Sequence, residues 1–246
     1  MFSQIQFKVV LLCLFAIFLI GCEDETADDN TNTTTDGVVD YSHPVLKFDG
    51  VVYEQSTMEN ITSYDLNVQA GVPYSITIEE TGINDIIIKV LDSDTNLVVE
   101  SRNFHPTDAS KDQVIFVPLT NTTYHIGILA FGTITDPVTY NLKTEIADLS
   151  SGTPMAGLMM SYRMTYRFFS DGGPFTVDLV PTTGEANLFI YDRPPNDPNA
   201  NILVGAFDTG TDSITMDGPT VTNSPYYFQA TFIVEELTDY TIQVTQ

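Results

Sequence analysis

The chain has 246 residues, with 33 acidic against 9 basic side chains and a formal net charge of −24. Nucleic acids and anionic lipid headgroups are bound by clustered Lys and Arg, but the basic residues here stand singly along the chain. The charge therefore argues against both kinds of partner. The length suits one or two domains of about 100 to 150 residues each.

The first predicted element is a lipoprotein signal peptide over residues 1–21. Lys8 precedes an apolar run over residues 9–20. That run suits a signal-peptide core and is too short to cross a bilayer as a helix, which takes about 20 residues. The sequence Leu-Ile-Gly-Cys then ends at Cys22, and it resembles the bacterial lipobox. The resemblance implies cleavage before Cys22 and lipidation of Cys22, whereas a plain secretory signal is the alternative.

Residues 22–40 are predicted to form a lipidated, disordered and acidic tether. After Cys22 almost every residue is Asp, Glu, Asn or Thr, so the segment buries too little apolar surface to offset the entropy cost of ordering it. The acidic run resembles the surface-export signals of Bacteroidetes lipoproteins. Glu23 is not the Asp that favours inner-membrane retention in enteric bacteria. We therefore expect attachment to the outer membrane, at its periplasmic face or at the cell surface.

From residue 41 onward, short runs rich in Val, Ile, Thr, Tyr and Phe are separated by Gly, Pro, Asn and Asp. Residues 74–78 and 176–180 alternate apolar with polar side chains, as strands with one buried face do. These patterns predict an all-β fold of antiparallel β-sandwiches, of jelly-roll or Ig-like type. For the Met-rich residues 154–166 we expect a helix turn followed by a strand.

The chain also matches itself at an offset of about one hundred residues. The matches are residues 72–78 with 173–179, 86–92 with 186–192, 114–116 with 213–215, and 139–143 with 239–243. Four matches in one order predict two tandem β-sandwich domains, over residues 41–148 and 149–246. Their join is expected in the polar stretch 147–153.

The first of these halves resembles a known family, the bacterial pre-peptidase C-terminal domain, a small antiparallel β-sandwich appended to secreted enzymes and surface proteins. The resemblance covers most of residues 46–146 and rests on segments 48–52, 64–71, 92–98, 124–128 and 140–142. Residues 154–246 fit the family more loosely, because 170–173 replace an Ala-Gly turn and 193–199 enlarge a hairpin. Some members of the family bind calcium near the entrance of the domain.

The residues that commonly carry catalysis are sparse. There is no Gly-x-Ser-x-Gly motif; Cys13 lies in the signal peptide and Cys22 is the predicted lipid site, so the mature chain has no disulfide and no cysteine nucleophile. His43, His105 and His125 are too far apart in sequence for a Cys/His zinc motif. His105 lies in a predicted loop, where it faces either a ligand or solvent, and His125 lies in a predicted strand.

One segment has the spacing of a calcium loop. Asp92, Asp94 and Asn96 stand at positions 1, 3 and 5, but Leu97 and Asn103 occupy the positions where an EF-hand needs Gly and Glu. Asp and Asn also cap tight turns by bonding their own backbone. We therefore predict a hairpin turn here, with no metal and no other cofactor.

The predicted function is that of a non-catalytic, lipid-anchored envelope protein. Its two modules bind a polysaccharide or a surface protein, or act as spacers. The alternative is an accessory of a secreted hydrolase or a component of a carbohydrate-active enzyme. An open cleft with converging carboxylates would distinguish the alternative from the first prediction.

Overall fold

The computed structural model describes residues 44–57, 61–80, 86–101, 111–130, 137–158, 163–182, 185–207, 211–217, 222–232 and 239–246. The predicted signal peptide, Cys22 and the tether lie outside these residues, as do His43 and His105. Residues Ser42–Gln246 form one compact unit. No helix in the described ranges has the length and apolar character needed to cross a membrane.

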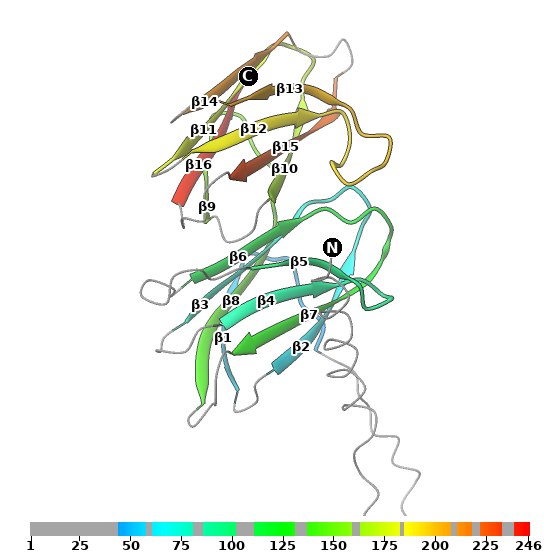
Figure 1. Cartoon of the computed structure of the whole chain (residues 1–246), viewed down its shortest axis with the longest axis vertical. Helices are drawn as coiled ribbons and strands as arrows, with labels where there is room; N and C mark the ends of the chain where they lie inside the picture. Colours follow the sequence, from blue (N-terminus) through cyan, green and yellow to red (C-terminus); the bar gives the residue numbers. More distant parts are fainter. Residues whose placement is uncertain are drawn as a thin grey trace, which may run out of the picture. The chain divides into compact units, whose positions relative to one another are not determined.

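Two four-stranded antiparallel sheets come from the first half of the chain (Figure 1). Their strands are β1 (Val52–Thr57), β2 (Ile61–Val68), β3 (Tyr74–Glu80), β4 (Ile86–Leu91), β5 (Leu97–Glu100), β6 (Lys111–Phe116), β7 (Thr122–Ala130) and β8 (Val138–Ile146). The strand order is β1-β8-β3-β6 in one sheet and β2-β7-β4-β5 in the other. We call this pair of sheets the first sandwich.

Two further four-stranded antiparallel sheets come from the second half. Their strands are β9 (Met155–Leu158), β10 (Arg163–Ser170), β11 (Phe175–Pro181), β12 (Ala186–Tyr191), β13 (Ile202–Ala206), β14 (Asp212–Met216), β15 (Ser224–Phe232) and β16 (Asp239–Thr245). The orders are β14-β11-β16-β9 and β10-β15-β12-β13. We call this pair the second sandwich.

The two sandwiches have the same topology. Adding eight to each strand number converts the sheet orders of the first sandwich into those of the second. This equivalence confirms the internal repeat, with one correction to its register. Val114 pairs with Ile76, and Ile214 pairs with Val177, the repeat partner of Ile76. Val114 therefore corresponds to Ile214, whereas the sequence match had aligned it with Ser213. The register differs by one residue because both side chains must face a core.

Each sandwich encloses its own apolar core, as the alternating patterns predict. On β4 and β12 alternate residues are buried and intermediate in exposure. The buried residues of these two strands are Ile86, Ile88 and Val90 in the first sandwich and Ala186, Leu188 and Ile190 in the second. Burial of apolar surface on the facing sides of two sheets is the main stabilising contribution in such folds.

The helix turn expected within residues 154–166 is wrong where the structure describes them. Residues Met155–Leu158 form β9, which pairs with β16. Gly157 lies opposite Tyr240 in this pairing and leaves no room for a side chain, because a Cβ atom there would collide with the Tyr240 ring. Because Gly157 has no side chain, strand β9 can lie close to the buried Tyr240 ring.

The polar stretch 147–153 is hydrogen-bonded along much of its length. Asp148 forms a parallel bridge with Arg167, and Leu149 N donates to Arg167 O at 2.7 Å. Gly152 N donates to Val244 O at 2.8 Å. In the first sandwich Val45 bridges Asp65 in the same way, so both sandwiches begin with the same local structure. The domain boundary between residues 148 and 149 stays a prediction.

Candidate functional site

The histidine that the structure describes takes part in a strand-to-strand contact. His125 lies on β7 opposite Asp65 of β2, and its Nδ1 is 2.8 Å from Asp65 Oδ1. Cross-strand pairs of this kind stabilise sheets. The prediction that His125 is a strand residue is confirmed.

The proposed turn at residues 92–96 is visible in its hydrogen bonds. Asp92 Oδ1 accepts bonds from the backbone N–H groups of Asp94, at 2.9 Å, and Asn96, at 2.8 Å. Partial burial acts to raise the pKa of Asp92, but the bonds from Asn96 and Asp94 outweigh it and lower that pKa. The Asp92 carboxylate therefore caps the hairpin between β4 and β5.

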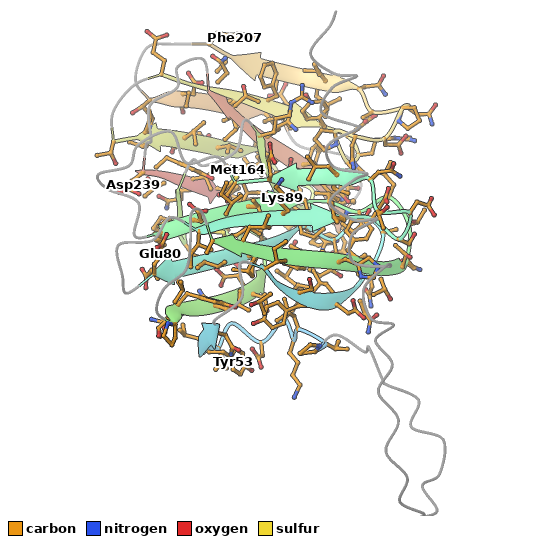
Figure 2. All side chains as sticks on the ribbon, turned by 60° about the horizontal axis from the view of Figure 1, so that its bottom comes forward. Tyr53, Glu80, Lys89, Met164, Phe207 and Asp239 are labelled. Atoms are coloured by element: carbon orange, nitrogen blue, oxygen red, sulfur yellow. The ribbon has the colours of Figure 1, made fainter. Side chains whose placement is uncertain are left out.

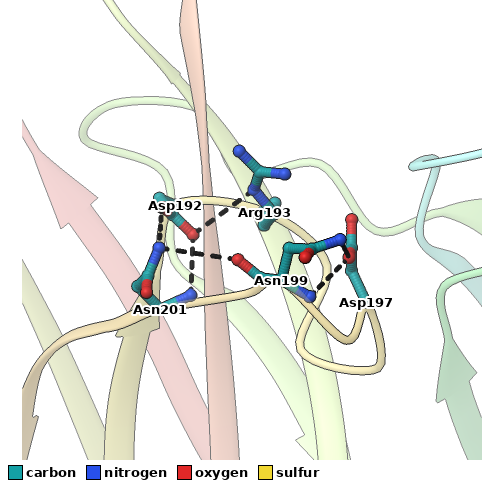
Figure 3. Close-up of polar contacts among 5 residues, drawn as sticks. All are labelled: Asp192, Arg193, Asp197, Asn199 and Asn201. Carbon is teal, nitrogen blue, oxygen red and sulfur yellow. Dashed lines mark hydrogen bonds and ion pairs between the residues drawn. The ribbon is translucent and has the colours of Figure 1, made fainter.

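The equivalent hairpin of the second sandwich is capped in the same manner (Figure 3). Asn201 donates from its backbone to Asp192 Oδ1 at 2.9 Å and from its side chain to Asp192 Oδ2 at 2.8 Å. The side-chain bond from Asn201 is the main cause of the lowered pKa of Asp192. Two hairpins with the same cap at repeat positions indicate a structural role for Asp92 and Asp192.

We expect calcium to act on this acidic protein only by diffuse screening of its charges. Millimolar calcium and sodium matched for ionic strength should raise the melting temperature by similar amounts. The substitutions Asp92→Asn and Asp94→Asn together should leave this response unchanged. A saturable calcium shift that the double variant abolishes would show a specific site instead, since specific binding stabilises the native state up to saturation.

Buried tyrosine pairs form a second repeated feature. In the first sandwich the hydroxyls of Tyr64 and Tyr140 share a hydrogen bond of 2.9 Å. In the second, the hydroxyls of Tyr166 and Tyr240 share one at the corresponding place. Burial raises the pKa of Tyr64, Tyr166 and Tyr240, because it disfavours the charged phenolate.

Two buried carboxylates complete the repeated set. Asp112 Oδ2 accepts a bond of 2.7 Å from the Ser101 hydroxyl, whose oxygen accepts the Ile88 N–H at 2.8 Å. Asp212 Oδ2 accepts the Leu188 N–H directly at 3.1 Å. Both acids lie on an edge strand of one sheet; Asp212 accepts a backbone N–H of the other sheet directly, and Asp112 is linked to the equivalent N–H through Ser101. Sequence reasoning missed them, although a pair of Asp residues one hundred positions apart in matched strands was a usable signal.

The two sandwiches meet at a junction that has no repeat counterpart. Arg167 on β10 donates to both oxygens of Asp148, at 2.7 and 2.8 Å, and to Gly71 O of the first sandwich at 2.8 Å. Tyr227 on β15 also donates to Gly71 O, at 2.8 Å. The enlarged hairpin contributes Asn196, whose side chain donates to Val117 O at 2.8 Å.

Apolar packing joins the same surfaces. Ile115 is 2% exposed and, although it lies on β6 of the first sandwich, it packs with the core cluster of the second. Its neighbour in the sheet, Ser75, is also buried and accepts a bond of 3.0 Å from the Gln113 side chain. The outer face of this part of the first sandwich is therefore covered by the second.

Beside this junction lies a cleft of about 740 Å³ that both sandwiches line. The first sandwich contributes Thr77, Lys111, Gln113, Lys143 and Glu145; the second contributes residues of β9, with Thr182, Asp239, Tyr240 and Thr241; residues of the 147–153 stretch complete it. The volume falls within the range of about 300 to 1,000 Å³ typical of small-molecule sites. The cleft is the candidate functional site.

Several charged groups that line the cleft form ion pairs, with each other or with residues beside the cleft. Lys143 Nζ is 2.8 Å from Glu145 Oε2, and Asp148 is held by Arg167. Lys111 Nζ is 3.6 Å from Glu79 Oε1. No group of three His, Cys, Asp or Glu side chains suited to a metal occurs within the described residues. The cleft offers hydroxyl, amide and ion-paired groups beside apolar ones.

No family model and no curated protein sequence matches the chain. Among solved structures it is similar to the pre-peptidase C-terminal domain of collagenase from Bacillus anthracis, at 10% identity and a TM-score of 0.35, over 42% of this chain and 93% of that one. It is also similar to the tandem CBM22-1 and CBM22-2 domains of Xyn10C from Paenibacillus barcinonensis, at 8% identity and a TM-score of 0.25, over 81% and 92% of the two chains.

A third similar structure is a protein from Eubacterium rectale described as secreted, at 11% identity and a TM-score of 0.28, over 78% of this chain and 72% of that one. Because all three TM-scores are low, neither the fold nor the function of this chain is inferred from these likenesses. A pre-peptidase C-terminal domain is nevertheless among the structures that the chain resembles, and the closer assignment to that family stays a prediction.

Proposed function

We propose that this protein is a non-catalytic, lipid-anchored protein of the bacterial outer membrane. Cys22 carries the lipid, residues 22–40 form the tether, and the two sandwiches make up a single body that binds a surface polysaccharide or a surface protein. A body joined as firmly as this one also serves as a spacer that carries its binding surface away from the membrane.

The cleft between the sandwiches is the observation that carries this proposal. Elsewhere several buried polar side chains recur at repeat positions in the two sandwiches, as the tyrosine pairs and Asp112 with Asp212 do. The cleft has no such counterpart, because it exists only where the two sandwiches meet. Two of its three acids, Glu145 and Asp148, are ion-paired, which favours binding over acid–base catalysis for them.

Lipid anchoring has its own test in the substitution Cys22→Ser. We expect the variant to move from the membrane fraction to the soluble fraction, because two or three acyl chains supply essentially all of the membrane affinity. Intact-mass measurement should show the loss of the acyl groups. Ser3→Ala, elsewhere in the signal peptide, serves as the control and should remain acylated and bound. A Cys22→Ser protein that is still acylated and membrane-bound would contradict the anchor.

A further inference from the structure

Strand β9 has one edge that no other strand covers. It stands last in the sheet β14-β11-β16-β9 and pairs with β16 on one side. On its other side no strand in the described part of the chain pairs with it. Met155, Ala156 and Gly157 of β9 line the cleft, and β9 passes near β6 of the first sandwich (Figure 1). We call this side of the strand the free edge of β9.

The register of the sheet shows which backbone groups point to the free edge. In an antiparallel sheet, successive residues of a strand direct their N–H and C=O groups to opposite neighbours. Thr182 N donates to Asp239 O at 2.7 Å, so Asp239 turns its backbone groups towards β11, and Tyr240 turns its own towards β9. Tyr240 lies opposite Gly157. Gly157 therefore directs its backbone groups to β16, whereas Ala156 directs its N–H and C=O to the free edge.

Backbone groups on an exposed edge can pair with a strand from another chain. Ala156 is exposed, and its outward N–H and C=O have no backbone partner within the described residues. Edge strands are often protected by charged side chains, proline or bulges. Apart from being short, β9 has none of these protections, since its sequence is Met-Ala-Gly-Leu and its pairing with β16 is regular. An extended peptide has the amide and carbonyl groups that match such an edge.

The charge of the cleft favours a basic peptide. Both lysines of the cleft and two of its acids are already ion-paired. The third acid, Asp239, is exposed at the start of β16 (Figure 2), and its carboxylate has no partner among the described residues. The whole chain carries a formal net charge of −24, which attracts basic segments and repels acidic ones.

Asp239 lies on the face of the sheet where it can pair with a side chain of such a peptide. Tyr240 is buried in the core, so Asp239 and Thr241, on either side of it, lie on the outer face. Thr241 lies opposite Ala156, whose side chain is small. A strand added to the free edge would run two strand spacings of about 4.8 Å from β16. The long side chain of a lysine or arginine can cross that distance over Ala156.

We infer that the free edge of β9 binds an extended, basic segment of a partner protein as an added strand. The backbone of the segment bonds to Ala156, and one of its lysine or arginine side chains pairs with Asp239. This inference rests on the proposed function, because it names the class of partner for the same cleft. A polysaccharide lacks the repeating amide groups that match the edge, and a second copy of this chain has the same large negative charge.

The test uses the full chain carrying Cys22→Ser and a short fluorescent peptide of alternating lysine and threonine. Fluorescence anisotropy at about 0.15 M salt, where diffuse attraction is largely screened, gives the dissociation constant. An acidic control peptide has glutamate in place of lysine. Two further peptides keep the charge but carry N-methyl groups on the backbone amides of all lysines or of all threonines. Since alternate residues of an added strand face β9, one methylated peptide loses its bonds to the edge and the other keeps them.

We expect the basic peptide to bind saturably and the acidic peptide not to bind. One of the two methylated peptides should bind about tenfold more weakly or worse, in keeping with the loss of backbone hydrogen bonds, and the other should bind like the parent.

Variants of the protein test the same contacts. Ala156→Pro removes the outward N–H and should abolish binding, because edge positions tolerate proline without loss of the sheet. Ala156→Ser keeps the N–H and should bind normally. Asp239→Asn should weaken binding several-fold, whereas Asp94→Asn, which removes an equal charge from the hairpin between β4 and β5, should leave it unchanged. Circular dichroism shows whether each variant is folded; if Ala156→Pro is not, the methylated peptides decide, since they leave the protein unaltered.

The inference is overturned if the basic peptide does not bind, or if both methylated peptides bind like the parent, because charge alone would then hold it. A dimer in size-exclusion chromatography that Ala156→Pro dissociates would place a second copy at the free edge and also reject the inference. A polysaccharide that slows hydrogen exchange at β9 and at residues 143–145, with no peptide binding, would keep the proposed function and reject the basic segment. If no polysaccharide, surface protein or peptide changes exchange there, both fail.

Discussion

Replacing Gly157 with alanine is expected to destabilise the protein by about 3 kcal/mol, the upper range for forcing extra volume into a packed interior. The added Cβ atom would collide with the Tyr240 ring and come within 2.7 Å of the Tyr166 hydroxyl oxygen. Both tyrosines are buried and hydrogen-bonded to each other, so neither ring can move aside without losing that bond. Urea unfolding followed by circular dichroism gives the free energy of unfolding.

Gly173→Ala is the matched control in the same sandwich. Its added Cβ atom would lie 3.4 Å from its nearest neighbour, an ordinary contact. We expect a change within about 0.5 kcal/mol, as for most surface substitutions. Equal effects of the two substitutions would show that β9 does not pack on Tyr240 as described.

Removing the Arg167 side chain is the second change with a large expected effect. Arg167→Ala deletes a bidentate ion pair with Asp148 and a bond to Gly71 O, and it leaves the Asp148 carboxylate without its guanidinium partner. The Arg167 side chain is only 12% exposed, so solvent screens the pair weakly. We expect a loss of about 2 to 3 kcal/mol, in keeping with bonds to charged groups.

The coupling between the two partners is measured by a double-mutant cycle. The double variant with Arg167→Ala and Asp148→Asn should lose less stability than the sum of the two single changes. The difference should be about 1 kcal/mol or more. Lys111→Ala is the control, because the exposed pair of Lys111 with Glu79 contributes about 0.5 kcal/mol or less. Additive effects of Arg167→Ala and Asp148→Asn would mean that the ion pair does not hold the junction.

The junction also bears on thermal unfolding. With Ile115 packed in the second core and Gly71 bonded by Arg167 and Tyr227, the two sandwiches should unfold in a single calorimetric transition. Arg167→Ala should broaden that transition or divide it in two.

Local patterns were sufficient to predict the sandwiches but not their junction. Period-two alternation marks which side chains of β4 and β12 face a core, and the repeat places both strands in the same topology. Ile115 is apolar like its neighbours on β6, so the sequence does not show that it faces away from the core of the first sandwich. Its side chain is buried because it packs in the core of the second sandwich. Composition likewise predicted that residues 147–153 join the two domains. It did not predict the backbone hydrogen bonds of this stretch to β10 and β16.

The candidate site was beyond sequence reasoning for a related reason. The residues that line the cleft come from both halves of the chain, and each has an ordinary local role, as Lys143 and Glu145 do on β8.

Hydrogen exchange of the soluble Cys22→Ser chain tests the proposed function most directly. The chain is measured alone, with the surface polysaccharide of the bacterium, and with its surface proteins. If the cleft is the binding site, one of these fractions slows exchange at β9 and at residues 143–145 of β8, on the two sides of the cleft, in a saturable manner. Exchange at both segments that neither fraction changes would contradict the proposed binding function.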